Sequence, residues 1–125
     1  MPIDFSFSQE VEDARLMMRG FLQDTVKPAF AALQADKDAQ RADWSALVKS
    51  LRQKAKAQGC WLPHMPQDVG GMGLGVTALA AVSAEAAKIP MGPYIINAQA
   101  PDEGNMHTLY HFATDYQREH FLKPL

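Results

Sequence analysis

The strongest constraint on the fold of this chain is the spacing of its apolar residues, which recur at steps of three and four. The clearest run lies between positions 43 and 59, where lysines and arginines occupy the other faces: Trp44, Leu47, Val48, Leu51 and Ala55. Such a period gathers apolar side chains along one stripe of an amphipathic helix. No window alternates apolar and polar residues long enough to predict a strand with a hairpin partner. The chain is therefore predicted to be all-α.

Helix-start and helix-stop signals divide the first half of the chain into two long helices. The first is expected to begin near Ser8, whose hydroxyl can accept from the free N–H groups of the opening turn. Pro28 should kink this helix or begin a new one that continues to about Ala35. The second helix is predicted to have Asp43 as its N-cap and to end at Gly59, where a left-handed residue can close it.

The second half of the chain alternates between breakers and shorter helices. Two prolines and four glycines between Cys60 and Gly75 predict a long shaped loop, which we call the glycine loop. An alanine-rich helix should follow over 76–89, and its small number of charges predicts a central position, packed on several sides.

Prolines and capping signals then predict three further helices. After Pro90 and Pro93 we expect a short helix over about 94–100. Asp102 should cap the next helix, which runs to about residue 113. The pair Thr114 and Gln117 forms a capping box for the last one. The sequence thus predicts five to six helices without an internal repeat.

Length, charge and cysteine content restrict the kind of protein this can be. The 125 residues amount to one domain, and 12 Lys and Arg against 14 Asp and Glu give a net charge of −2. That balance argues against nucleic acid as a partner, because phosphates need an excess of positive charge. The single Cys60 excludes an internal disulfide and a cysteine-cluster zinc site. With no targeting or membrane-spanning segment recognisable, we expect a cytoplasmic protein.

The glycine-rich stretch Asp68–Gly75 of the glycine loop is a candidate phosphate cradle. It has neither the spacing of a P-loop nor that of a dinucleotide fingerprint, and no predicted strand precedes it. The favoured interpretation is a turn that needs positive φ or a close approach of backbones.

Other chemistry-bearing residues each have a functional and a simpler interpretation. His107 and His111 lie one helical turn apart, with Glu103 and Asp115 at the same step on either side, so they could bind a metal. A solvated helix face is the favoured alternative. Cys60 could be a nucleophile with His64 as its base, or a small buried hydrophobe. The seven methionines could line an adaptable apolar cavity or fill gaps in a core.

The order of these features resembles the N-terminal α-helical domain of acyl-CoA dehydrogenases, over essentially the whole chain. The resemblance is carried by four segments: Phe5–Glu10, Gln58–Trp61, Pro66–Gly73 and Ala113–Leu125. A fifth segment, Asn97–Met106, is similar to the long-chain, fusion-type branch of the family. The implied fold is an orthogonal helical bundle. The chain would then be a single domain, residues 1–125, ending where the middle domain of a three-domain flavoenzyme begins.

This resemblance implies an FAD-dependent dehydrogenase that desaturates acyl-CoA thioesters between the α and β carbons. The flavin would lie against the middle and C-terminal domains and a neighbouring subunit, so a homo-oligomer is expected. The base would be a glutamate outside this chain, and an electron-transfer flavoprotein would accept the electrons. The domain alone should therefore be inactive and should contain no catalytic, FAD-binding or metal-binding residue.

What the resemblance assigns to this chain is part of the acyl-chain pocket. Ile96, Asn97, Ala100 and Gly104 fall on the chain-lining positions of the family. The alternative is that these residues only pack the domain, and Asp102 is better explained as a helix cap than as a substrate contact. At the level of the whole protein, the alternative is a free-standing helical module that binds another protein or an acyl chain.

Overall fold

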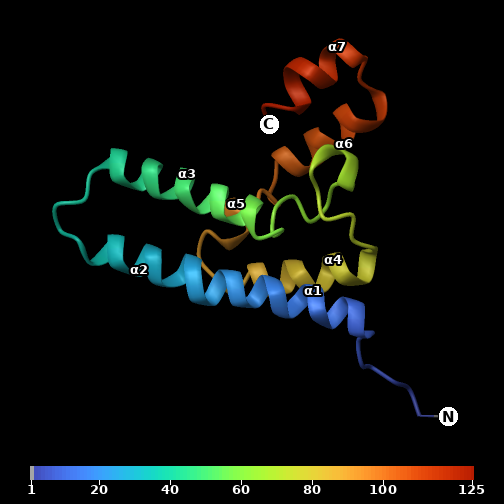
Figure 1. Ribbon diagram of the computed structural model, residues 1–125, viewed down its shortest axis with the longest axis horizontal. Helices are drawn as coiled ribbons and strands as arrows, with labels where there is room; N and C mark the ends of the chain where they lie inside the picture. The colour runs from blue at the N-terminus through green and yellow to red at the C-terminus, as the bar shows by residue number, and fades with distance from the viewer. Residues whose placement is uncertain (1) are drawn as a thin grey trace.

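A computed structural model describes residues 2–125, and every regular element in that range is helical (Figure 1). The α-helices are α1 Gln9–Gly20, α2 Lys27–Ala35, α3 Arg41–Ala57, α4 Val76–Ala86, α5 Gly92–Ile95, α6 Asp102–Phe112 and α7 Asp115–Gln117. Wider π-helical turns cover Phe21–Val26 and Arg118–Leu122, and a 3-10 turn covers Gln67–Val69. The all-α prediction is confirmed, since no strand occurs among residues 2–125.

Residues 9–35 form one nearly continuous helical rod from α1 through the π-helical turns to α2 (Figure 1). Ser8 caps it as predicted, because its hydroxyl accepts from the N–H of Val11 at 3.4 Å. Pro28 begins a new helix, occupying the second position of α2. The π-helical turns Phe21–Val26 lie immediately before it, and their looser winding accommodates a ring that would collide with a carbonyl in an ordinary helix.

The prediction that Asp43 is the N-cap of the second long helix is wrong by one turn. Gln40 is the N-cap of α3, and Asp43 is the third residue of the helix. The Asp43 carboxylate reaches back and accepts from the Gln40 N–H at 2.7 Å. Asp43 therefore satisfies a free N–H at the start of the helix, as a capping-box residue does. The far end agrees with the prediction, since Gly59 follows the helix with φ +72°.

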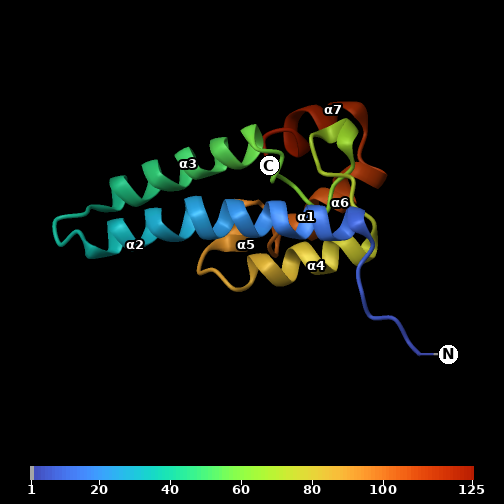
Figure 2. The same cartoon turned by 60° about the horizontal axis from the view of Figure 1, so that its bottom comes forward.

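The helices pack as two pairs that share one core. α1 lies along α4 and α2 lies along α3 (Figures 1 and 2), and α5 contacts both α3 and α4. The buried side chains between these helices include Met18, Phe21, Leu22, Val26, Phe30, Leu51, Val82, Ile89, Ile95 and Ile96. A smaller cluster of Leu62, Met65 and Met106 joins the glycine loop to α6.

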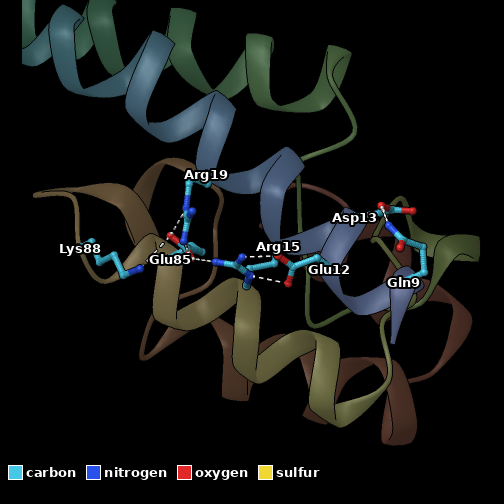
Figure 3. A network of polar contacts seen from close by, with 7 residues as sticks. All are labelled: Gln9, Glu12, Asp13, Arg15, Arg19, Glu85 and Lys88. Carbon is cyan, nitrogen blue, oxygen red and sulfur yellow. Dashed lines mark hydrogen bonds and ion pairs between the residues drawn. The ribbon is translucent and has the colours of Figure 1, made fainter. Parts of the chain in front are cut away.

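The prediction that α4 is central is wrong for the described residues, because α4 packs mainly on α1 and leaves the face of Val76, Thr77, Ala80, Ser83 and Ala84 exposed. The helix nevertheless carries one buried charge. Glu85 is 4% exposed. Its carboxylate accepts from Arg15 Nη1 at 2.7 Å, from Arg19 Nη2 at 2.7 Å and from Lys88 Nζ at 3.1 Å (Figure 3). Hydrogen bonds from these cations, that of Arg19 foremost, lower the pKa of Glu85 to about 2. Glu12, one turn before Arg15 on α1, holds the other side of the Arg15 guanidinium.

The region after α4 differs from the prediction in two places. The short helix is α5, Gly92–Ile95, and not a helix over 94–100. Asp102 is the first residue of α6, where Pro101 takes the cap position, so the predicted Asp102 cap is also wrong. The final capping box is confirmed, because Thr114 N donates to Gln117 Oε1 at 2.9 Å and Gln117 N donates to Thr114 Oγ1 at 3.3 Å.

Among residues 2–125, no helix combines the length and the apolar character needed to cross a membrane.

Replacing the buried carboxylate should loosen the packing of α1 on α4. We expect Glu85→Gln to lower the free energy of unfolding at pH 7 by about 1.5–3 kcal/mol, because charge-assisted hydrogen bonds are lost. The folded-state pKa of Glu85 is depressed from 4.5 to about 2, so its contribution is present above pH 4.5 and lost as the pH falls toward 2. Urea unfolding of wild type and variant should show the gap closing over that interval.

The matched control is Glu10→Gln, which removes an exposed carboxylate from the first turn of α1. It should change stability by less than about 0.5 kcal/mol. A gap between wild type and Glu85→Gln that stays constant down to pH 2 would show that the ionised carboxylate is not what holds the helices together.

Candidate functional site

The glycine loop turns its own N–H groups inward. Gly70 N donates to Gln67 O at 3.0 Å, Gly71 N to Pro66 O at 2.9 Å and Gly73 N to Met65 O at 2.9 Å. N–H groups that are used in this way cannot surround a phosphate. The favoured interpretation, a tight turn, is confirmed.

Two kinds of constraint explain the glycines in this loop. Gly70 and Gly73 have φ of +85° and +65°, a region that side chains disfavour. Gly71 is needed for space, because a Cβ there would lie 2.0 Å from the carbonyl oxygen of Met65. The loop is therefore packed to a single conformation rather than left open for a ligand.

Cys60 is a buried residue without the surroundings of a nucleophile. It is fully buried, and desolvation raises the pKa of its thiol to about 11. His64, its suggested base, makes its hydrogen bonds elsewhere, to Asn97 and His107. The simpler interpretation, a small buried hydrophobe, is the one the structure supports.

The glycine loop is joined to the segment after α5 by two strained residues. Leu62 and Asn97 both adopt left-handed backbone, with φ of 49° and 57°. Leu62 N donates to the carbonyl of Ile96 at 3.0 Å, and the ring of His64 lies 3.0 Å from the carbonyl of Asn97. Left-handed conformations cost energy for residues other than glycine and persist where the surrounding contacts enforce them. We call Leu62, His64, Ile96 and Asn97 the loop joint.

The histidines of α6 are arranged differently from the predicted His107 and His111 pair. His107 Nε2 lies 3.2 Å from Nδ1 of His64, in the glycine loop. Glu103 places a carboxylate oxygen near these two nitrogens, with the three ligand atoms within 4.8 Å of one another. His111 is exposed and stacks against His107, with ring centroids 6.3 Å apart. Asp115 lies in α7 and pairs with Arg118 at 3.9 Å.

The residues predicted to line an acyl chain divide into two buried and two exposed ones. Ile96 is fully buried in the main core, and Asn97 is buried with its Nδ2 donating to the carbonyl of Leu125 at 3.2 Å. Ala100 and Gly104 lie at the surface, on the turn that leads into α6 and on its first turn. A Cβ built on Gly104 would meet open space.

A hollow of about 820 Å³ opens between the glycine loop, α6 and the last turns of the chain. Its lining includes an apolar group, Trp61, Leu62, Met65, Met72, Met106 and Leu122, and a charged group, Lys56, Asp68, Arg118, Glu119 and Lys123. Met65, Met72 and Met106 thus line this hollow, as one interpretation of the methionines predicted. Met18, by contrast, fills the main core. Apolar walls with a few polar groups are typical of ligand sites and of surfaces that receive another domain.

Comparison with known proteins shows where this arrangement belongs. The model of the family described as "Acyl-CoA dehydrogenase, N-terminal domain" matches residues 8–125. The chain belongs to the acyl-CoA dehydrogenase family. The probable acyl-CoA dehydrogenase FadE2 of Mycobacterium tuberculosis is 33% identical over 130 residues, covering 98% of this chain and 30% of that protein. The rat (Rattus norvegicus) acyl-CoA dehydrogenase family member 11 is 27% identical over 126 residues, covering 97% and 16% respectively.

A solved structure agrees with this family assignment. The structure of a putative acyl-CoA dehydrogenase from Mycobacterium abscessus superposes with a TM-score of 0.81 and 26% identity, over 96% of this chain and 32% of that one. The resemblance drawn from the sequence is confirmed for the family and the fold. This acyl-CoA dehydrogenase domain spans only a sixth to a third of the length of these relatives.

Sequence reasoning missed the partner of His107. His64 lies 43 residues away in a glycine-rich loop, and only the folding of that loop onto α6 brings the rings together. Its place in the sequence Pro63-His64-Met65, between residues that turn out to be buried, was the available signal.

A side chain at Gly71 should open the glycine loop. We expect Gly71→Ala to lower the free energy of unfolding by about 3 kcal/mol, because the new methyl group collides with backbone that cannot move aside cheaply. Urea unfolding measures the effect. Gly104→Ala is the control, since its methyl group meets open space within a helix and should stabilise by about 0.5–1 kcal/mol. Equal effects of the two substitutions would contradict the close approach at Gly71.

Proposed function

We propose that residues 1–125 are the N-terminal helical domain of an FAD-dependent acyl-CoA dehydrogenase, which introduces a double bond between the α and β carbons of an acyl-CoA thioester. The observation that carries this proposal is the family match over residues 8–125. A fold shared at a TM-score of 0.81 with a putative acyl-CoA dehydrogenase supports it. Middle and C-terminal domains of the same parent chain complete the enzyme.

The chemistry divides between this domain and the rest of the protein. Desaturation needs a base on one face of the Cα–Cβ bond and a hydride acceptor on the other, with water excluded. Glu85, the buried carboxylate of the described residues, is unsuited as the base because three cations hold it ionised with a pKa of about 2. The glycine loop does not fit the FAD diphosphate, since its N–H groups are already bonded within the loop. We assign the base and the flavin to the other domains, as the family resemblance implies, and FAD would supply the hydride acceptor there.

The role assigned to this domain is one wall of the acyl-chain slot. Ala100 carries only a methyl group and Gly104 no side chain, and both lie at the surface, where a hydrocarbon tail can pass close to the backbone. Ile96 and Asn97 are buried, and we assign these two residues to holding the turn in place. Each methylene that leaves water in such a slot contributes about 0.8 kcal/mol.

Exposed apolar side chains support the expectation of further domains and subunits. Phe112 is 85% exposed, and Val76, Tyr116 and Phe121 are also exposed on the described surface. Side chains of this kind commonly contact a neighbouring domain or subunit. We assign them to the middle and C-terminal domains and to a second copy in a homo-oligomer. An electron-transfer flavoprotein is the proposed electron acceptor, and the cytoplasm is the proposed location.

The activity is tested on the full-length protein. It should carry flavin and be yellow, and anaerobic addition of an acyl-CoA should bleach the flavin absorbance as the substrate is oxidised. Residues 1–125 alone should bind no flavin and show no activity. A colourless full-length protein that is inert toward acyl-CoA would overturn the proposal and favour a free-standing helical module.

A large side chain at Ala100 should shorten the preferred acyl chain. We expect Ala100→Trp in the full-length enzyme to lower kcat/KM about fourfold for every methylene that the indole displaces. Short-chain substrates should be little affected. Ala32→Trp, an exposed substitution on α2, is the control and should leave the chain-length profile unchanged. An unchanged profile in Ala100→Trp would refute the placement of this turn in the acyl slot.

A further inference from the structure

We propose that His64, Glu103 and His107 form a binding site for a divalent transition metal ion of the zinc class, where the glycine loop meets α6. The three side chains come from two elements that are distant in sequence. Their ligand atoms lie within 4.8 Å of one another. None of the three ligands is a residue assigned to lining the acyl slot, although the site adjoins that turn, and the proposal does not depend on the dehydrogenase assignment.

The distance between the two imidazoles suits a shared metal ion. Nδ1 of His64 and Nε2 of His107 are 3.2 Å apart. Two nitrogens bound at about 2.05 Å to one tetrahedral zinc ion are separated by about 3.3 Å. The separation of the two ring nitrogens therefore already matches that expected around a shared ion. Without an ion, the same distance is filled by a hydrogen bond from His107 to His64.

The backbone selects the tautomer of His64 that a metal requires. Nε2 of His64 lies 3.0 Å from the carbonyl of Asn97, which can only accept, so Nε2 carries the proton. Nδ1 then presents its lone pair toward His107. Metal-binding histidines commonly donate their second N–H to a carbonyl in this way, which fixes the ring.

Glu103 completes the set with a negative charge. It lies one helical turn before His107 on α6, so both side chains project from the same face of the helix. His64 is buried, whereas Glu103 and His107 are half-buried. That exposure leaves room for water as a fourth ligand. Two imidazoles and one carboxylate favour zinc, cobalt or nickel over magnesium and calcium, which prefer oxygen ligands.

An ion at this position would tie the glycine loop to the first turn of α6. Asn97, whose carbonyl orients His64, belongs to the loop joint, and Glu103 directly precedes Gly104. Metal binding would therefore stiffen the segment between α5 and α6 from both ends. The expected consequence is a higher unfolding temperature in the presence of Zn²⁺.

The test is Zn²⁺ binding to the full-length protein after removal of metal with a chelator. Equilibrium dialysis and calorimetry should show one tightly bound Zn²⁺ ion per wild-type chain. His107→Gln should bind Zn²⁺ with an affinity at least tenfold lower. Glu103→Gln should also weaken binding. Mg²⁺ at the same concentration should not compete. The primary variant is at His107 because His64 is buried and its replacement can disturb folding.

The matched control is His111→Gln, which removes the neighbouring exposed imidazole one turn further along α6. It should bind Zn²⁺ as wild type does. Equal binding by wild type and His107→Gln would overturn the proposal, as would an absence of tight binding to wild type. A loss in His111→Gln as large as that in His107→Gln would also overturn it, because the ligands would then be the surface pair on α6.

Discussion

The burial of the Glu85 carboxylate between α1 and α4 is the interaction on which the rest of the domain depends. A charge removed from water is costly unless ionic partners with good geometry surround it. Arg15 and Arg19 supply such partners from α1, and Lys88 supplies another just beyond α4 (Figure 3). Because the two arginines lie one turn apart, the carboxylate fixes both the rotation and the axial position of α1 against α4.

Close backbone contacts extend that fixed pair toward the proposed acyl slot. A Cβ at Gly92 would lie 2.3 Å from the carbonyl oxygen of Ala86, so α5 begins directly against the end of α4. The loop joint then binds the segment after α5 to the glycine loop through the bond from Leu62 to Ile96. The position of the turn into α6 is thus set by the packing of α4, through α5 and the loop joint.

Features with a local cause could be predicted from the sequence. The Ser8 cap, the end of α3 before Gly59, the glycine loop and the Thr114 capping box each depend on neighbouring residues. The cap of α3 was misplaced by a turn because Asp43 serves an N-terminus equally well from the third helical position. Features that depend on partners distant in the sequence could not be predicted from it.

The candidate functional site likewise combines features with a local cause and features that depend on distant partners. The turn geometry of the glycine loop followed from its composition, whereas the pairing of His64 with His107 depends on how that loop folds back. The spacing of apolar residues also gave no indication that Glu85 is buried. A single acid in an alanine-rich helix was the visible oddity, and its explanation lies on α1, 66 residues away from Glu85 in the case of Arg19. The exposure of Ala100 and Gly104 likewise depends on how tertiary packing shortened α5.

The π-helical turns Phe21–Val26 determine which helices α1 and α2 each pack against. Accommodating an extra residue in a helix rotates everything beyond it by about 100° relative to regular winding. The rod can therefore direct one side toward α4 before these turns and another side toward α3 after them (Figure 2). Adding or removing one residue here would rotate α2 away from α3. This short stretch therefore determines that α1 packs on α4 while α2 packs on α3.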